Sequence, residues 1–265
     1  MFSLSPGLTA YLLFLTALLG LCMGSFFNCF AWRMAHGESV LKGRSHCPAC
    51  GHILGALDLV PVFSYLCLRG RCRYCGEKIS PRYPAAELVS LLVFLSLVLR
   101  YDITLTTLRL LVLACLLFTV ALVDLEVRRI PDGLLLAAVI WYLATLPLVA
   151  PKFLPALQQG LLGGILVAGP LLLFVLLADR LLGRESMGGG DIKLFFVVGL
   201  YLGPALNLLN LILSCLLGVI FGIIFYPRCA DSSRAIPFGP AAAAGTWLTL
   251  LWGNTILHWY LGLFF

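Results

Sequence analysis

The sequence has little charge for its length. Only 11% of its 265 residues are Asp, Glu, Lys or Arg, whereas 61% are hydrophobic and the mean hydropathy is +1.03. A soluble domain does not need so much apolar surface, so an ordinary globular protein is excluded. The basic residues lie in loops between apolar runs, and therefore no nucleic-acid-binding surface is expected.

What the chain has instead is a series of apolar runs of about 20 residues, the length that a bilayer-spanning helix needs. The first run has no Lys or Arg before it and no small-x-small cleavage pattern after it, so we expect a retained helix and not a signal peptide. The predicted fold class is therefore an all-α polytopic membrane protein with about eight transmembrane helices. Their expected ranges are 6–32, 84–99, 104–123, 133–149, 157–182, 191–202, 206–226 and 238–264.

Three parts are expected along the chain: transmembrane helix 1 at 1–32, a polar segment at 33–83, and a core of the other helices at 84–265. Helix 191–202 is too short to cross a hydrocarbon layer of roughly 30 Å at 1.5 Å per residue, unless the layer is thinned there. The distribution of Lys and Arg nevertheless favours a membrane crossing by this helix. With eight crossings every Lys and Arg lies on one side except Arg100, Arg109 and Lys152. The positive-inside rule makes that side the cytoplasm, with both termini outside.

The polar segment carries two CxxC pairs, each followed by a glycine that permits a turn with positive φ. The four cysteines are Cys47, Cys50, Cys72 and Cys75. Four thiolates are a tetrahedral zinc site, and a closed shell of this kind is structural and not catalytic. A redox CxxC is the alternative, but a redox motif does not need duplication. Because the cytoplasm is reducing, two disulfides are not expected.

Carboxylates are costly inside a bilayer and therefore mark candidate functional positions. Asp191 follows three glycines, Gly188, Gly189 and Gly190, at the start of a helix, and Asp124 ends a long apolar helix at the same side. Acids at helix ends also reach the headgroup region without any function. Two carboxylates that meet share a proton, and such a pair hydrolyses a peptide bond through water. The flexible glycine strand is expected to pair with an extended substrate and hold it there. None of the four histidines lies near a plausible serine nucleophile in the sequence.

Six motifs in this order resemble the type IV prepilin peptidases, which are bifunctional leader peptidases and N-methyltransferases of the GxGD aspartyl protease class. The motifs are residues 24–28 with Arg33, the two cysteine pairs, 79–84 leading to Glu87, Asp124 with 130–132, 188–191 with Lys193, and 236–240. The resemblance covers nearly the whole chain. It implies Asp124 and Asp191 as the catalytic pair.

The resemblance also implies a reaction and a location. The enzyme is expected to remove the basic leader of a type IV prepilin or of a type II secretion pseudopilin at the cytoplasmic border of the bacterial inner membrane. It is then expected to methylate the new N-terminus with S-adenosylmethionine. This second activity rests on the resemblance alone, because no βαβ nucleotide-binding pattern is visible in the sequence.

Four further residues have candidate roles. Glu87 is a candidate for meeting the positive leader, and Asn28 for orienting a substrate carbonyl; an exposed helix-start acid and a helix–helix hydrogen bond are the alternatives. Lys193 is expected to bind a lipid phosphate in preference to an aspartate. Gly70 is a candidate cofactor contact, although a turn explains it equally simply.

Two other functions fit parts of the sequence. One is an intramembrane GxGD protease that acts on other single-span proteins without methyl transfer, but that activity gives no reason for the cysteine pairs. The other is a zinc-regulated ion transporter that uses Asp124 and Asp191. Transporters often contain related halves, and none is visible here.

Overall fold

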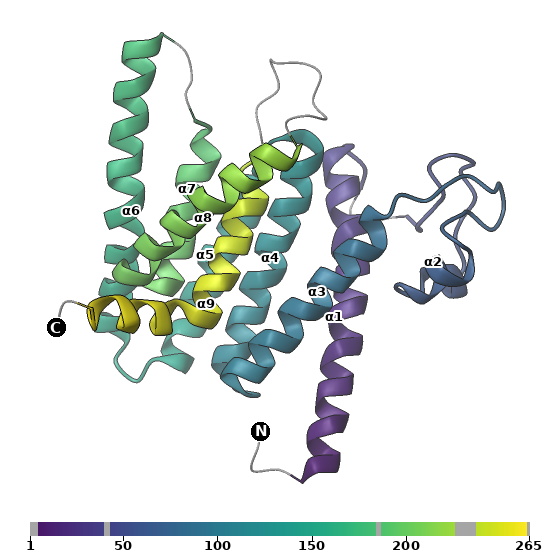
Figure 1. The fold of residues 1–265 in the computed structure, drawn as a ribbon, viewed down its shortest axis with the longest axis horizontal. Helices are drawn as coiled ribbons and strands as arrows, with labels where there is room; N and C mark the ends of the chain where they lie inside the picture. Colours follow the sequence, from purple (N-terminus) through teal and green to yellow (C-terminus); the bar gives the residue numbers. More distant parts are fainter. Residues whose placement is uncertain (1–4, 40–42, 184–186, 226–236, 264–265) are drawn as a thin grey trace. The chain divides into compact units, whose positions relative to one another are not determined.

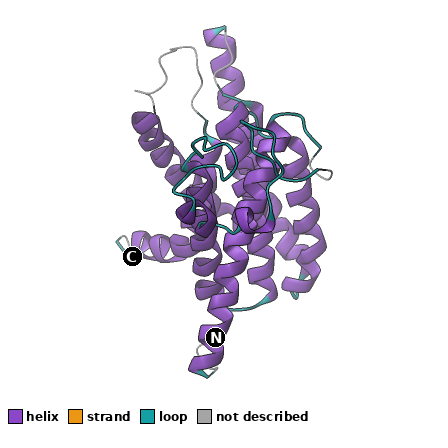
Figure 2. Cartoon of the chain, turned by 90° about the vertical axis from the view of Figure 1, so that its right-hand side faces the viewer, coloured by secondary structure: helices purple, strands orange, loops and turns teal. Residues whose placement is uncertain are grey.

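The computed structural model describes residues 5–39, 43–183, 187–225 and 237–263. Within these ranges the chain is built from helices and loops with no β-strand (Figure 2), so the predicted all-α class is confirmed. In chain order the elements are α1 (Pro6–Ala35), the 3₁₀ turn η1 (Ala56–Leu59), α2 (Phe63–Cys67), α3 (Arg82–Tyr101), α4 (Leu105–Val127), α5 (Asp132–Val149), α6 (Phe153–Leu182), α7 (Gly189–Leu202), α8 (Pro204–Phe225) and α9 (Gly239–Leu261).

Among the described residues, six helices are long and apolar enough to cross a bilayer, namely α1, α3, α4, α5, α6 and α8. The chain is therefore a multi-pass membrane protein. With 14 residues α7 is about 21 Å long and is not among these six helices. The helix α9 is not among them either. The expected total of eight crossings remains a prediction for these two helices.

Several helices extend beyond the ranges expected from the sequence. The helix α4 continues to Val127, so Asp124 lies within its last turn and not at its end. The helix α6 begins at Phe153, which places Pro155 in its first turn, where a missing N–H costs nothing. Each extension has the same cause. In an apolar environment a backbone N–H or C=O group outside a helix has no hydrogen-bond partner. The helices therefore continue until polar residues can provide one.

The chain forms two compact units, residues 1–107 and 108–265. The helix α3, which we expected to belong with the core at 84–265, packs in the first unit against α1. Gly20 and Gly24 make this packing possible: a Cβ on Gly20 would lie 2.9 Å from the Leu91 Cα, and one on Gly24 would lie 2.8 Å from the Glu87 Cα. Four-residue spacing of small residues is a common way for membrane helices to approach closely.

In the second unit α6 packs against α7, and α8 against α9 (Figure 1). The contact between α6 and α7 is backbone against backbone. A Cβ on Gly163 would lie 2.4 Å from the Gly199 carbonyl oxygen and 2.6 Å from the Gly203 Cα. Small residues on both helices are therefore required at this crossing, and they fix the position of α7 along α6.

Buried amides of α8 add polar links between these helices. The Asn207 amide donates to the carbonyls of Gly163 in α6 and Phe195 in α7, at 2.9 and 3.1 Å. The Asn210 oxygen accepts from Ser214 and, in α9, from Thr246. Because all of these polar groups lie away from water, their mutual hydrogen bonds fix how α6, α7, α8 and α9 are turned about their axes.

A buried arginine connects three helices near the other end of α4. Arg109 is 8% exposed and lies over the rings of Tyr142 in α5 and Tyr201 in α7, 4.5 and 5.0 Å from their centres. The Trp141 indole donates to the Arg109 carbonyl at 3.2 Å. From the sequence, Arg109 was counted among the charges on the side opposite the cytoplasm, whereas in the structure its side chain is stabilised within the helical unit by cation–π contacts.

The crossing of α6 and α7 gives a test of the second unit. We expect Gly163→Ala to lower the free energy of unfolding by about 1–3 kcal/mol, because the new methyl group forces the backbones apart. Gly169→Ala is the matched control in the same helix, since a Cβ there meets nothing nearer than Ile165 at 3.9 Å. Thermal unfolding in detergent measures both. Equal melting temperatures for the two variants would contradict the close approach.

Candidate active site and metal centre

The first turn of α7 lies against the connection between α4 and α5. A Cβ on Gly190 would lie 3.0 Å from the Ile130 Cβ, so the absence of a side chain lets the two segments touch. Nearby, the Lys193 ammonium donates to the Asp132 carboxylate at 2.7 Å. Two segments that are about 60 residues apart in the sequence are thereby held together, and each of them carries one of the two predicted catalytic acids.

Asp124 is buried, with 5% of its surface exposed, and its Oδ2 accepts a hydrogen bond of 2.7 Å from the Gly239 N–H at the start of α9. A Cβ on Gly239 would lie 2.8 Å from that same oxygen. Glycine is therefore required for the N–H to reach the carboxylate. Gly239 was expected only as part of a motif; an N–H that is free at a helix start was the available signal for this contact.

Asp191 lies in the first turn of α7 and is half-buried. The Asp124 carboxylate is close enough for its charge to act on the Asp191 carboxylate. The structure therefore places the two acids that the sequence singled out within electrostatic range of each other. Two neighbouring carboxyl groups that hold one proton between them contain both a general acid and a general base.

Two of the three glycines before Asp191 belong to α7. Gly189 and Gly190 are the first two residues of α7, and only Gly188 has an extended backbone, with φ −66° and ψ 133°. The Asp191 N–H bonds to the Gly188 carbonyl at 3.1 Å. Pairing of this stretch with a substrate stays a prediction, and the N–H groups of Gly189 and Gly190, at the start of α7, have no partner within the helix.

Lys193 was expected to bind a lipid phosphate in preference to an aspartate, and in the structure its partner is Asp132. Asp132 lies in the first turn of α5. Both side chains are well exposed to solvent. The ion pair therefore connects the two segments but contributes little to the free energy of folding. Of the motif at 236–240, residue 236 lies outside the described residues.

The four predicted metal-ligating cysteines do form a cluster. The sulfur atoms of Cys47, Cys50, Cys72 and Cys75 all lie within 4.8 Å of one another, and no disulfide joins them. A tetrahedron of thiolates around a zinc ion of about 2.3 Å bond length has sulfur separations in this range. The residues therefore fit a single metal ion.

Each cysteine pair is folded as a small turn of the same design. The Gly51 N–H bonds to the Cys47 carbonyl, and the Gly76 N–H bonds to the Cys72 carbonyl. Both glycines have positive φ, of 69° and 72°, as predicted. In the second turn, hydrogen bonds from the N–H groups of Cys75 and Tyr74 lower the pKa of the Cys72 thiol to about 7. A thiolate is the form of cysteine that binds metal, so these backbone hydrogen bonds favour the metal-binding form of Cys72.

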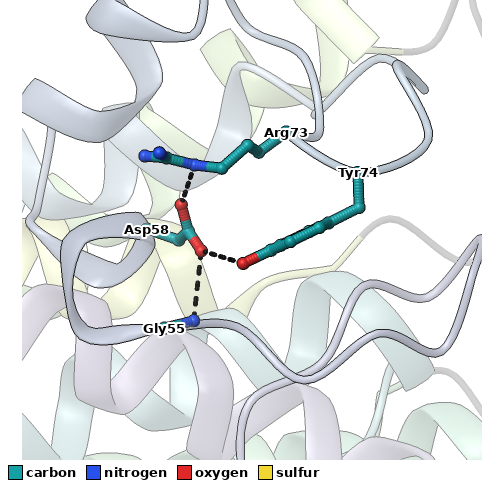
Figure 3. Close-up of polar contacts among 4 residues, drawn as sticks. All are labelled: Gly55, Asp58, Arg73 and Tyr74. Atoms are coloured by element: carbon teal, nitrogen blue, oxygen red, sulfur yellow. Dashed lines mark hydrogen bonds and ion pairs between the residues drawn. The ribbon is translucent and has the colours of Figure 1, made fainter.

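Asp58 on η1 links the loop at Gly55 to the second cysteine turn and was not singled out from the sequence. Its carboxylate accepts from the Gly55 N–H at 3.1 Å, from Arg73 at 2.7 Å and from the Tyr74 hydroxyl at 3.2 Å (Figure 3). The Gly55 N–H and then the Arg73 guanidinium hold the pKa of Asp58 below its ordinary value. A glycine three residues before an aspartate is a turn signal, and it is the only one that the sequence offered here.

The other predicted residues lie in the first unit. Glu87 is 7% exposed and accepts the Val62 N–H at 2.7 Å, so it is not an exposed helix-start acid. Asn28 is half-buried on α1. Gly70 has φ 68°, and a Cβ there would lie 2.9 Å from the Tyr65 hydroxyl, which supports its role in a turn. A cofactor contact for Gly70 stays a prediction.

Comparison with known proteins agrees with the division into two units. Residues 18–101 match the bacterial peptidase A24 N-terminal domain, and residues 111–223 match the type IV leader peptidase family. No solved structure is significantly similar to the chain.

Several curated relatives named prepilin leader peptidase/N-methyltransferase are similar over most of the sequence. The relative from Bacillus subtilis is 36% identical over 91% of this chain and 95% of its own length. The relative from Aeromonas salmonicida is 40% identical over 84% of this chain and 76% of its own. The relative from Pseudomonas aeruginosa is 32% identical over 93% and 92%. With these matches over both units, the chain belongs to the type IV leader peptidase family.

Proposed function

We propose that the chain is a membrane-embedded aspartic endopeptidase that removes the leader of type IV prepilins or pseudopilins and methylates the new N-terminal amine with S-adenosylmethionine. The observation that carries the peptidase half is the juxtaposition of Asp124 and Asp191 at the contact of α7 with the α4–α5 connection. The names of the relatives support both activities.

Cleavage proceeds through water held between the two carboxyl groups. The ionised group takes a proton from the water, whose oxygen attacks the carbonyl carbon of the scissile peptide bond. The protonated group gives its proton to the carbonyl oxygen, and the tetrahedral intermediate then breaks its C–N bond as the nitrogen receives a proton. The Gly239 N–H keeps the Asp124 carboxylate in place during these transfers.

The active site lies at the cytoplasmic border of the membrane in this proposal. The Lys and Arg residues on the Asp124 and Asp191 side of the helices support that orientation through the positive-inside rule. The substrate presents a basic leader on this side, with an apolar helix that follows in the bilayer. Gly188, with its extended backbone, is a position in this stretch that is available to pair with substrate.

Zinc is the metal that we assign to Cys47, Cys50, Cys72 and Cys75. Four thiolates and a tetrahedral arrangement favour zinc among the common ions, and they leave no coordination position for a substrate. When bound, the ion supplies structure: it replaces a hydrophobic core that this short segment lacks.

Substitution of each aspartate by asparagine tests the proposed cleavage mechanism. We expect Asp124→Asn and Asp191→Asn each to abolish prepilin cleavage, because an amide neither donates an acidic proton nor accepts one from water. Methylation of a leaderless pilin peptide should persist in both variants. Asp179→Asn in α6 is the control and should cleave normally. Mass spectrometry of a co-expressed prepilin reads leader loss and methyl increment together. Cleavage by either active-site variant would exclude the aspartyl mechanism.

The metal centre is testable by composition. Cys47→Ser and Cys72→Ser should each lose the bound zinc, measured by elemental analysis of the purified protein, and should lower the melting temperature of the first unit. Cys67→Ser is the matched control, because this exposed cysteine of α2 is not part of the cluster. Full zinc content in the Cys47 and Cys72 variants would show that the cluster is not the site.

A further inference from the structure

The loop between α1 and α3 exposes a row of apolar side chains. Leu57, Val60, Phe63 and Leu66 follow one another at intervals of three residues, and each has between 39% and 74% of its surface exposed. Side chains three residues apart lie above one another in a 3₁₀ turn such as η1, and they share a face in a helix such as α2. We call these four residues the exposed ridge.

The opposite face of the same stretch carries polar groups. Asp58, Ser64 and Tyr65 line a cavity of about 400 Å³ that is enclosed by α1, the cysteine-bearing segment and the start of α3. A segment that is surrounded by water usually has the reverse arrangement, with apolar side chains inside and polar ones outside. A contiguous group of exposed apolar side chains marks a surface that contacts a membrane or another protein. The exposed ridge therefore needs an apolar partner.

A hydrogen bond fixes the depth of this ridge along a membrane-spanning helix. The N–H of Val62, between Val60 and Phe63, donates to the Glu87 Oε2 at 2.7 Å. Glu87 lies five residues after Arg82, where α3 begins, which is about 7.5 Å along the helix axis. With 20 residues α3 is about 30 Å long and only just spans the hydrocarbon layer. Glu87, and with it the start of α2, therefore lies at the boundary between headgroups and lipid tails.

The arrangement of the helices agrees with this depth. In Figure 1, where α1 runs vertically with its N-terminal end at the bottom, α2 lies lower than the first turn of α3. Both α1 and α3 are long and apolar enough to cross the bilayer, so the loop that joins them leaves and re-enters at the same surface. After α1 the loop thus turns back toward the lipid, and α2 is the part that reaches it.

Positive charge lies next to the exposed ridge. Arg69 and Arg71 closely follow α2, and both are exposed. From residue 59 to residue 86 the chain has five basic residues and a single acid, Glu77. Anionic phospholipids attract such an excess of positive charge at a membrane surface. Apolar side chains beside basic ones are the pattern of segments that lie in the bilayer interface.

We propose that the exposed ridge docks on the bilayer, with Phe63 and Leu66 among the upper parts of the lipid tails and Arg69 and Arg71 at the phosphates of anionic headgroups. The partner is the lipid surface beside α1 and α3. Docking gives the cysteine-bearing segment a third attachment to the membrane, in addition to the two helices. The contact goes beyond the proposed function, because neither the two aspartates nor the metal ion takes part in it.

The test is quenching of an added tryptophan by brominated lipid tails. The full-length, zinc-loaded Phe63→Trp variant is reconstituted in phosphatidylglycerol bilayers with ordinary or brominated tails, and the emission of the five native tryptophans is subtracted with the wild-type protein. We expect brominated tails to lower the emission of the added tryptophan by about twofold or more. Glu77→Trp is the matched control and should be quenched clearly less, because Glu77 is exposed but is not part of the ridge. Zinc content equal to that of the wild type shows that both variants are folded.

Two results would overturn the proposal. One is equal emission of Phe63→Trp in ordinary and brominated lipid. The other is protection of Phe63→Trp from aqueous iodide only when a prepilin is added, because the ridge would then be a protein-binding surface.

The headgroup contact has its own test. Addition of Arg69→Gln and Arg71→Gln to Phe63→Trp should reduce the quenching in phosphatidylglycerol, which is anionic, and leave it unchanged in phosphatidylcholine, which is not. The same quenching with and without the two arginines in phosphatidylglycerol would contradict the contact with anionic headgroups.

Discussion

The account depends on one contact, the approach of the first turn of α7 to the connection between α4 and α5. Gly190 allows it by having no side chain where Ile130 packs, and the Lys193–Asp132 pair closes it. Through this contact two carboxyl groups from distant parts of the sequence come within reach of each other's charge. A membrane protein gains little from such a pair as structure, since burial of acids is costly. The proposed catalysis gives the arrangement a reason.

The helices behind the site are packed to keep that contact in place. Glycines of α6 and α7 touch backbone to backbone, and Asn207 bonds to carbonyls of both helices. On the other side of the site, α9 begins at the glycine whose N–H holds Asp124. Lipid tails are as apolar as leucine side chains, so helix packing in a bilayer relies on close approach and buried hydrogen bonds. Both features are concentrated in the unit that carries the acids.

Much of the fold and of the candidate site could be predicted from the sequence, for physical reasons that differ from residue to residue. The cysteine cluster was predictable because CxxC spacing constrains geometry locally, and the aspartates because acids are rare in apolar runs. The extent of the helices was underestimated, because backbone hydrogen bonding in an apolar surrounding outweighs the helix-breaking tendency of Gly189 and Gly190. Contacts such as Gly239 with Asp124, or Asp58 with Arg73, depend on tertiary approach, and the helix-start and turn signals in the sequence do not identify the partner.

The pH dependence of kcat/KM for prepilin cleavage by the purified enzyme tests the shared proton most directly. A pair of neighbouring carboxyl groups is active when it holds one proton, so activity should fall at low pH, where both are protonated, and also at higher pH, where both are ionised. We therefore expect a two-sided pH profile. A rate that rises with pH to a plateau would mean that one base works alone, and would contradict the pairing of Asp124 with Asp191.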